Sequence, residues 1–332
     1  MTLPLTIAGG GLAGLSLGIA LRERGVPVTL HDALEYPRHR VCGEFLSGVS
    51  DEVLGSLGIT FALKDAVPLR SSCWHDEEGP IRVMEVRGRG ISRHRLDDRL
   101  QSHFRELGGT LVTGSRIEPG EGVIWAAGRP RRTSGWIGLK CHFRDLPLAH
   151  DLEMHVGRSG YIGLARIEDS KVNVCGLFRK RESSGAKGVM LFRRYLRDLG
   201  LVDLSHRLDE AVAEPESLCG VAGISFEPFK TRHLSIGDAA SIIPPFTGNG
   251  MSMALEAAFH AMVPAMDYAE GKISWDQAIR KNHCHASRAF GRRLRVAKLL
   301  HAVVSDGRGS KWVRRLGMTR FLPFGMLYRT LR

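Results

Sequence analysis

A glycine motif near the N-terminus restricts the fold of this chain more than any other feature. The motif, residues 9–14, reads GGGLAG and lies between an apolar run and a segment with helical apolar spacing. This order predicts a strand over 3–8, a helix over 12–24 and a second strand over 26–31. Gly9 permits the tight turn, and Gly14 permits close packing of the helix on the strand. The chain therefore begins with a βαβ unit of an α/β fold.

The same motif predicts a dinucleotide site. Gly11 lets the backbone approach a pyrophosphate, and Leu12 and Ala13 begin a helix whose first N–H groups are free to bind phosphate. Asp32 lies 18 residues beyond Gly14, at the end of the second strand, where a carboxylate accepts hydrogen bonds from a ribose diol. An acid at this position disfavours NADP as the resident dinucleotide.

The excess positive charge is confined to the C-terminal region. The chain has 47 Lys and Arg against 35 Asp and Glu, but residues 281–332 hold 13 of the basic residues and one acid, Asp306. The first 280 residues are therefore neutral, which argues against a nucleic-acid-binding protein. Two alternatives remain for 281–332: a solvated helical face, or a basic amphipathic surface for an anionic membrane or an acidic carrier protein.

Other local patterns exclude several classes of protein. The six cysteines form no CxxC pair, which indicates reduced thiols without a structural zinc site or a disulfide framework. His283 and His285 are two residues apart, so a helix would direct them to different sides, and no metal site is predicted. No apolar run reaches about 18 residues, and residues 1–8 carry no charged side chain, so we expect a cytoplasmic protein that at most contacts a membrane surface.

A second glycine motif lies near residue 240. The predicted strand 233–236 runs into Gly237-Asp238, and residues 244–250 read PPFTGNG before a predicted helix. Together with the first motif, this pattern resembles the FAD-dependent family that includes p-hydroxybenzoate hydroxylase-like monooxygenases, geranylgeranyl reductases and flavin-dependent halogenases. The resemblance covers about residues 3–260.

The resemblance implies roles for the residues of this second motif. Asp238 would hold a ribityl hydroxyl of FAD. The following turn would bring a helix N-terminus toward the flavin pyrimidine, where its dipole favours the negative charge of a reduced flavin. The implied cofactor-binding residues of this turn and helix start are Pro245, Gly248, Asn249, Gly250 and Met251.

Three further segments match the family. Residues 93–100, with the spacing RxxLDxxL, resemble the helix that covers the cofactor and include Arg93. Residues 123–128 (VIWAAG) resemble its apolar strand, which ends at Ala127 and Gly128. The third segment, RxCGE at residues 40–44, resembles one that runs beside the flavin in the reductase and halogenase branches.

This third segment contains the candidate catalytic residues. Arg40 could neutralise cofactor phosphate or ring charge. Cys42 has no sequence neighbour that marks it as a nucleophile, so packing and an active-site role are both open. Glu44 is a candidate general acid or base, with an ordinary surface glutamate as the alternative.

The fold class that follows is α/β, with a Rossmann-type, glutathione-reductase-like FAD-binding domain, an inserted antiparallel β-sheet substrate domain and a helical C-terminal tail. Alternating apolar and polar residues over 136–178 predict that inserted sheet. The expected FAD-binding domain comprises residues 1–70, 91–135 and 225–280. The expected substrate domain comprises 71–90 and 136–224, and the basic helical region comprises 281–332.

The resemblance implies an FAD-dependent oxidoreductase of secondary metabolism. We favour a monooxygenase that uses oxygen and NAD(P)H to hydroxylate a hydrophobic or aromatic small molecule. NAD(P)H would bind only transiently, because the chain has no second GxGxxG motif. The alternatives are a reductase of polyprenyl or polyketide C–C bonds and a non-catalytic flavin-binding or carrier-interacting protein. The WxWxIP element of flavin halogenases is absent, and its counterpart at residues 160–164 lacks both tryptophans and the proline, which argues against halogenation.

Overall fold

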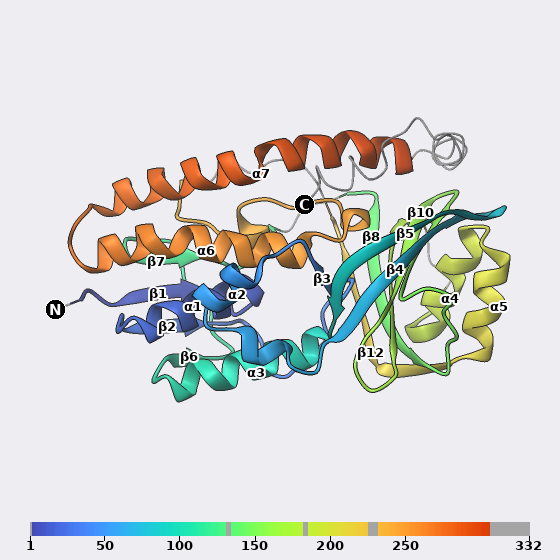
Figure 1. Ribbon diagram of the computed structural model, residues 1–332, viewed down its shortest axis with the longest axis horizontal. Coiled ribbons are helices and arrows are strands. Elements are labelled where there is room, and N and C mark those ends of the chain that lie inside the picture. The colour runs from blue at the N-terminus through green and yellow to red at the C-terminus, as the bar shows by residue number, and fades with distance from the viewer. Residues whose placement is uncertain (1, 131–133, 182–184, 225–231, 306–332) are drawn as a thin grey trace.

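The computed structural model describes residues 2–130, 134–181, 185–224 and 232–305. These residues form a four-stranded sheet of order β6-β2-β1-β7 and an eight-stranded sheet of order β12-β8-β11-β10-β9-β4-β5-β3, which lie side by side along the long axis (Figure 1). The strands are β1 (Leu5–Ala8), β2 (Val28–His31), β3 (Phe45–Ser47), β4 (Val67–Asp76), β5 (Gly79–Gly90), β6 (Thr110–Val112), β7 (Val123–Trp125), β8 (Trp136–Arg144), β9 (Leu152–Gly157), β10 (Gly160–Arg166), β11 (Val172–Arg179) and β12 (Val212–Ala222). The α-helices are α1 (Leu12–Glu23), α2 (Asp51–Ser56), α3 (Arg93–Glu106), α4 (Gly188–Asp198), α5 (Val202–Glu210), α6 (Gly250–Ala269) and α7 (Trp275–Ser305).

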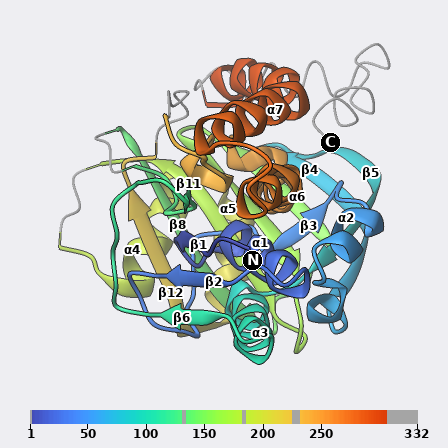
Figure 2. The same ribbon diagram turned by 90° about the vertical axis from the view of Figure 1, so that its left-hand side faces the viewer.

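The first sheet is parallel, as the βαβ prediction requires. β1 pairs with β2 on one side and with β7 on the other. α1 connects β1 to β2, and every residue from Leu12 to Leu21 is buried. A helix that is apolar and buried around its whole circumference must pack against other elements on every side. Seen end-on, α6 and α7 lie on one side of this lobe and α3 lies on the opposite side (Figure 2).

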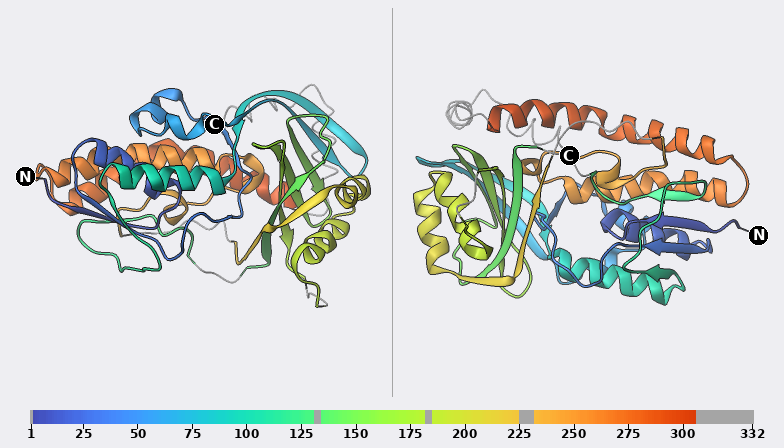
Figure 3. Two further views of the ribbon diagram at one scale, coloured as in Figure 1. Left: turned by 90° about the horizontal axis from the view of Figure 1, so that it is seen from below. Right: turned by 180° about the vertical axis from the view of Figure 1, so that it is seen from behind.

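The second sheet forms the other lobe. Strands β8 to β12 are antiparallel neighbours, and the long β4–β5 hairpin joins them through a parallel pairing of β4 with β9. Helices α4 and α5 cover the outer face of this sheet, away from the first lobe (Figure 3). The predicted fold class is therefore confirmed.

Several elements differ from the sequence expectations. The expected last parallel strand, 233–236, is reduced to a single bridge between Trp125 and Ser235. The sequence did not predict α5, β12 or the full length of the β4–β5 hairpin. In these segments the order of polar and apolar residues follows neither the helical nor the strand period.

The expected boundary at residue 281 falls inside α7. This helix begins at Trp275, and its residues Ala278, Phe290 and Ala297 are buried in the core of the first lobe. Residues 306–332 lie outside the described part of the chain. Within the described residues, no helix is both long and apolar enough to cross a membrane.

Candidate cofactor site

The first glycine turn fits closely against β7. Gly9 has a φ of +109°, and a Cβ at this position would lie 2.2 Å from the carbonyl oxygen of Ala126. A Cβ on Gly14 would lie 2.0 Å from the carbonyl oxygen of Gly9. On the other side of the turn, a Cβ on Gly11 would meet no atom within 4 Å. The turn is thus packed against protein on one side and open on the other.

The N-termini of α1 and α6 have no side-chain caps, a property they share with α4 and α5 on the other lobe. Gly11 is the N-cap of α1 and Asn249 is the N-cap of α6; neither helix has a side-chain cap or an acid in its first turn. In contrast, Ser50 caps α2 and Ser92 caps α3. Uncapped N–H groups and the helix dipole both favour an anion.

The turn at Gly237 brings these two helix ends together. A Cβ on Gly237 would lie 3.1 Å from the Cβ of Ala13, in the first turn of α1. Gly237, Asp238 and Gly250, the first residue of α6, line one pocket. Gly237 therefore lies against the start of α1 and lines a pocket with Asp238 and the start of α6; we call the region around these segments the cofactor cleft.

Asp238 lines this pocket and is exposed, and Ala127, which follows β7, and Pro245 are also exposed residues. The surrounding protein removes solvent and raises the pKa of Asp238, while the charges of Arg129, Arg93 and Arg40 oppose that rise. A carboxylate that lines this pocket and makes no hydrogen bond to the described residues is well placed to accept hydrogen bonds from hydroxyl groups of a ligand.

The other predicted acid, Asp32, is already engaged by the protein. It accepts hydrogen bonds from the Gly10 backbone N–H at 2.8 Å, the Leu34 N–H at 2.9 Å and the Arg38 guanidinium at 2.7 Å. Burial acts to raise its pKa, but Arg38 and the other donors hold the pKa below its usual value. A ribose would have to share this carboxylate with Arg38, so its ribose-binding role stays a prediction.

The two predicted arginines are held by one buried acid. Arg40 Nε lies 2.9 Å from Asp97 Oδ2, and Arg93 Nε lies 2.8 Å from Asp97 Oδ1. Asp97 is fully buried, whereas the Arg40 side chain is 28% exposed and also donates to the Gly10 carbonyl oxygen at 3.2 Å. Asp97 thus fixes a positive group beside the glycine turn, where cofactor phosphate is predicted.

The turn before α6 contacts the RxCGE segment. Gly248 has a φ of +68°, and a Cβ there would lie 2.0 Å from the Phe45 ring. Asn249 and Met251 are buried at the start of α6. Gly128, after β7, has a φ of +75° and an open side. The structure therefore brings together segments near residues 10, 45, 127, 238 and 250, which are far apart in the sequence.

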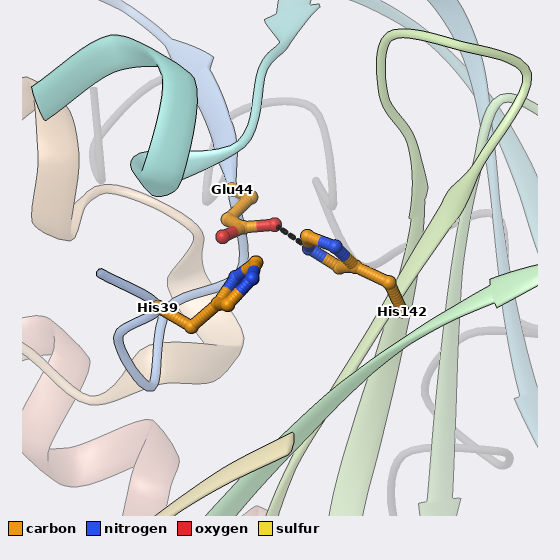
Figure 4. A group of neighbouring side chains, drawn as sticks. All are labelled: His39, Glu44 and His142. Carbon is orange, nitrogen blue, oxygen red and sulfur yellow. Dashed lines mark hydrogen bonds and ion pairs between the residues drawn. The ribbon is translucent and has the colours of Figure 1, made fainter. Parts of the chain in front are cut away.

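Glu44 lies in a buried ionic cluster between the two lobes. It has a positive φ of +56° and no exposed surface. Its carboxylate lies 2.5 Å from His142 Nε2 and 3.2 Å from Lys140 Nζ, and it accepts from the Arg93 backbone N–H at 3.0 Å (Figure 4). Burial acts to raise the pKa of Glu44, but His142, Lys140 and Arg93 hold it below its usual value.

His39 completes this cluster. Its Nδ1 lies 3.1 Å from Lys140 Nζ, and its ring stacks on His94 with centroids 4.6 Å apart. Burial and the nearby charges of Lys140, His142 and His94 lower the pKa of His39 to about 4. A neutral His39 can accept a hydrogen bond from the Lys140 ammonium. The polar groups of the cluster are therefore satisfied by an ion pair between Lys140 and Glu44 with two imidazoles beside it.

Sequence reasoning missed Lys140, His142 and His39. A signal was present in β8, where Lys140 and His142 alternate with Leu139, Cys141 and Phe143. Two polar side chains at alternate positions of an otherwise apolar strand share one face of the sheet. That signal could have identified the face, but not the partner from residue 44.

Cys42 lies next to this cluster but is not activated. Burial raises the pKa of its thiol, with Arg93 opposing that rise, and the Glu44 N–H donates to its sulfur at 3.4 Å. A protonated thiol is a weak nucleophile. Its packing alternative fits this environment better, and a catalytic role stays a prediction.

The pair that was predicted not to bind metal occupies separate contacts on α7. His283 Nε2 lies 3.1 Å from the carbonyl oxygen of His233, and His285 Nδ1 lies 3.3 Å from that of His260. Their nearest polar contacts are thus with different parts of the protein.

No protein-family model matches the sequence, and no curated protein matches it. Solved structures do match it. PqsL of Pseudomonas aeruginosa, in complex with 2-aminobenzoylacetate, is 14% identical over 94% of this chain and 99% of that chain, with a TM-score of 0.73. Another structure of PqsL is described as a probable FAD-dependent monooxygenase.

Two other similar structures are of different activity classes. The flavin-dependent brominase Bmp2 is 16% identical over 100% of this chain and 93% of that chain, with a TM-score of 0.76. A geranylgeranyl bacteriochlorophyll reductase-like protein of Thermoplasma acidophilum is 15% identical over 99% of this chain and 95% of that chain, with a TM-score of 0.74. At these identities the chain shares their fold, which confirms the resemblance at the level of the fold.

Proposed function

We propose that this chain is an FAD-dependent oxidoreductase that acts on a hydrophobic or aromatic small molecule. The observation that carries the proposal is the cofactor cleft, where two uncapped helix N-termini, the open side of Gly11 and the accessible carboxylate of Asp238 meet. Fold neighbours described as FAD-dependent or flavin-dependent support it.

The residues of the cleft fit the polar parts of FAD. The N-termini of α1 and α6 suit its negative charges, and Gly11 leaves room for close approach of the pyrophosphate. Arg40 adds a fixed positive charge, and Asp238 would accept ribityl hydroxyls. When bound, FAD supplies the electron and hydride chemistry that no side chain of the protein provides.

The sheet face beside the cleft supports an apolar substrate. We define the apolar wall as the cluster formed by Met154, Val156, Tyr161, Leu177, Ile224 and Phe246. Phe246 comes from the turn before α6, and its ring meets Tyr161 edge-on with centroids 5.9 Å apart. These side chains exclude water and favour contact with an aromatic or aliphatic group.

The ionic cluster borders this wall. Glu44 is ionised and has three donors, so we assign it as a positioning residue that joins the RxCGE segment to β8.

For the reaction we propose monooxygenation with NAD(P)H and oxygen. A C–C bond reductase is the second candidate, because the Cys42-Gly43-Glu44 segment of the reductase branch is built into the lobe boundary. The third candidate is a non-catalytic flavin-binding protein, which differs from the two enzymes in showing no substrate-stimulated oxidation of NAD(P)H.

The test begins with the purified protein. We expect a yellow protein that releases about one FAD, and no FMN, on denaturation, because the glycine turn requires a dinucleotide pyrophosphate. FMN alone, or no flavin after reconstitution with FAD, would refute the proposal.

NAD(P)H oxidation then separates the three candidates. With 2-aminobenzoylacetate as an aromatic probe in air, the monooxygenase predicts probe-stimulated NAD(P)H oxidation and a hydroxylated product. Reduction of an unsaturated prenyl probe without oxygen would favour the reductase. No stimulation by either would favour the non-catalytic protein.

We further propose that the exposed face of α7 contacts an acidic carrier protein. α7 contains a single acid, Asp276. Six of its eleven exposed described residues are basic, and one, Leu299, is a large apolar residue; the eleven are Asp276, Gln277, Arg280, Lys281, Cys284, Ser287, Arg288, Arg292, Arg295, Lys298 and Leu299. Charge without an apolar stripe suits an acidic protein surface better than insertion into lipid.

An acyl carrier protein and anionic vesicles are the probes for this surface. Carrier binding should weaken as salt rises, because the Debye length falls from about 10 Å at 0.1 M to about 3 Å at 1 M. The double variant Arg288→Glu/Arg292→Glu should abolish it, whereas Arg105→Glu on α3 should not. Binding to vesicles alone, or no salt-sensitive binding, would contradict the proposal.

A further inference from the structure

A second group of metal-ligand side chains lies on the face of the eight-stranded sheet opposite the apolar wall. β4 and β9 pair in parallel, which places His75 opposite His155. Met154 of β9 belongs to the apolar wall, while Arg207 of α5 reaches Glu153. Because side chains alternate along a strand, Glu153 and His155 both point toward α5.

The three side chains converge closely. The ligand atoms of His75, Glu153 and His155 all lie within 4.8 Å of one another. His155 Nε2 lies 3.1 Å from Glu153 Oε2, and the two imidazoles stack with centroids 4.4 Å apart and planes 12° apart. Glu153 is 1% exposed and His155 is 5% exposed. This is a preformed group of two imidazoles and one carboxylate, in which Glu153 and His155 are shielded from solvent and His75 is half-buried.

One nitrogen of the group has no partner. His75 Nε2 is buried and makes no hydrogen bond among the described residues. A buried polar atom without a partner costs stability, and such an atom in a native protein often marks the place of a water or an ion. This atom belongs to His75, which lies opposite His155 and is the third ligand residue of the group.

The cluster of His39, Glu44 and His142 has similar side chains but differs in this respect. There the buried ammonium of Lys140 lies 3.1 Å from His39 Nδ1 and 3.2 Å from Glu44 Oε1, so a cation already occupies the centre. Lys140 has no exposed surface and cannot withdraw.

The cation beside the second group is held less tightly. Arg207 Nη1 lies 3.0 Å from Glu153 Oε2, but its side chain is 29% exposed, and its Nη2 donates to the Pro147 carbonyl oxygen. Among the described residues Arg207 makes no hydrogen bond to His75 or His155, and its charge alone acts on them. Arg207 can therefore release Glu153 and keep a hydrogen bond at the surface.

We propose that His75, His155 and Glu153 form a binding site for a divalent transition metal ion, with Zn²⁺ as the expected occupant. Two imidazoles and a carboxylate are a donor set that such ions favour, with water in the fourth position. On binding, the neutral His155 ring takes its other tautomer, in which the proton of Nε2 is held by Nδ1, so that Nε2 donates its electron pair to the ion together with His75 Nε2 and the Glu153 carboxylate. This proposal is independent of the proposed function.

The position of the site gives the ion a structural effect. The β4–β9 pairing is the junction between the β4–β5 hairpin and strands β8–β12 in the order of the sheet. An ion bound to both strands would fasten that junction, and a ligand that binds the folded state alone raises the melting temperature. Because the site faces α5, it would do so without contact with the cofactor cleft.

The test uses the full-length protein without a histidine tag, treated with EDTA and then titrated with ZnCl₂ by calorimetry. We expect one Zn²⁺ per chain and a rise in the melting temperature with Zn²⁺ concentration. His75→Gln and His155→Gln should each weaken binding by at least about tenfold. The matched control His283→Gln, on α7, should leave it unchanged.

Two measurements separate metal binding from damage to the fold. In the metal-free protein His75 Nε2 has no partner, so His75→Gln should keep the metal-free melting temperature and lose only the rise caused by Zn²⁺. Co²⁺ should give the absorption bands of a four-coordinate site, and these should disappear in His75→Gln. Three outcomes would overturn the proposal. Zn²⁺ could bind equally well in His75→Gln and His155→Gln, binding could be lost in His39→Gln but not in His75→Gln, or the protein could bind no Zn²⁺ at all.

Discussion

The buried charge of Glu44 allows a quantitative test of the ionic cluster. Glu44→Gln keeps the size of the side chain and removes its charge. The Lys140 ammonium, 3.2 Å away and fully buried, then loses its counter-ion. At an effective dielectric constant of about 20, two unit charges at this separation attract by about 5 kcal/mol. Breaking a buried pair by removing one partner typically costs about 3–5 kcal/mol, because the other charge remains buried.

We therefore expect Glu44→Gln to lower the free energy of unfolding by about 3 kcal/mol or more. The matched control is Glu77→Gln, the same substitution in the more exposed pair with Arg158, whose side chain is 71% exposed. That change should cost less than about 1 kcal/mol. Urea unfolding followed by tryptophan fluorescence, compared at a common m-value, measures both.

The double variant Glu44→Gln/Lys140→Met distinguishes charge from packing. Removal of the orphaned ammonium should recover part of the loss, because a buried pair replaced by apolar groups is often neutral in stability. If Glu44→Gln lies within about 0.5 kcal/mol of Glu77→Gln, or if Lys140→Met recovers nothing, the cluster is not the buried ion pair described above.

Glu44 also predicts a dependence on pH. Its pKa in the folded protein lies below its ordinary value of 4.5, so the folded state binds fewer protons than the unfolded state as the pH falls. The stability that Glu44 contributes is fully present above that ordinary value and is lost as the pH falls through the lower pKa of the folded protein. In Glu44→Gln this part of the acid dependence should be absent.

Three other predictions follow from the cleft and the buried imidazoles. Gly11→Ala should keep the melting temperature and weaken FAD binding, because the added Cβ enters the open side of the glycine turn. Gly14→Ala should lower the melting temperature, because its Cβ would lie 2.0 Å from the Gly9 carbonyl oxygen. Equal thermal shifts in the two variants would contradict this. Asp238→Ala should weaken FAD binding more than Asp32→Ala, because a lost hydrogen bond to the ligand costs about 0.5–3 kcal/mol of binding free energy. Only Asp32→Ala should destabilise the protein, because Asp32 is hydrogen-bonded to Gly10 and Arg38. Titration by flavin fluorescence measures the binding, and melting curves measure the stability. Two imidazoles should make stability fall between about pH 6.5 and pH 4, since the unfolded chain takes up protons that the folded protein excludes, and replacing each with Gln should reduce that slope in urea titrations. These are His39 and His301, whose pKa values are lowered by burial to about 4.

The sequence by itself determined the first lobe. Residues 9–14 define a βαβ unit because Gly9 and Gly14 meet local needs that other residues cannot: a Cβ on Gly14, for example, would lie 2.0 Å from the Gly9 carbonyl oxygen. The roles of Asp238 and the turn around Gly248 came from the resemblance to the FAD-dependent family, which a short segment with both the loop and the helix start makes recognisable. Local spacing is visible in a sequence.

Tertiary structure alone decided the partners of the polar residues. Glu44 looked like a possible surface glutamate, yet the sheet brings Lys140 and His142 to it from about 100 positions away. Asp32 looked free for a ribose, yet the chain folds Arg38 back onto it. His75 and His155 become neighbours only through the parallel pairing of β4 with β9. Such contacts depend on how distant strands pair, and no local spacing records that choice.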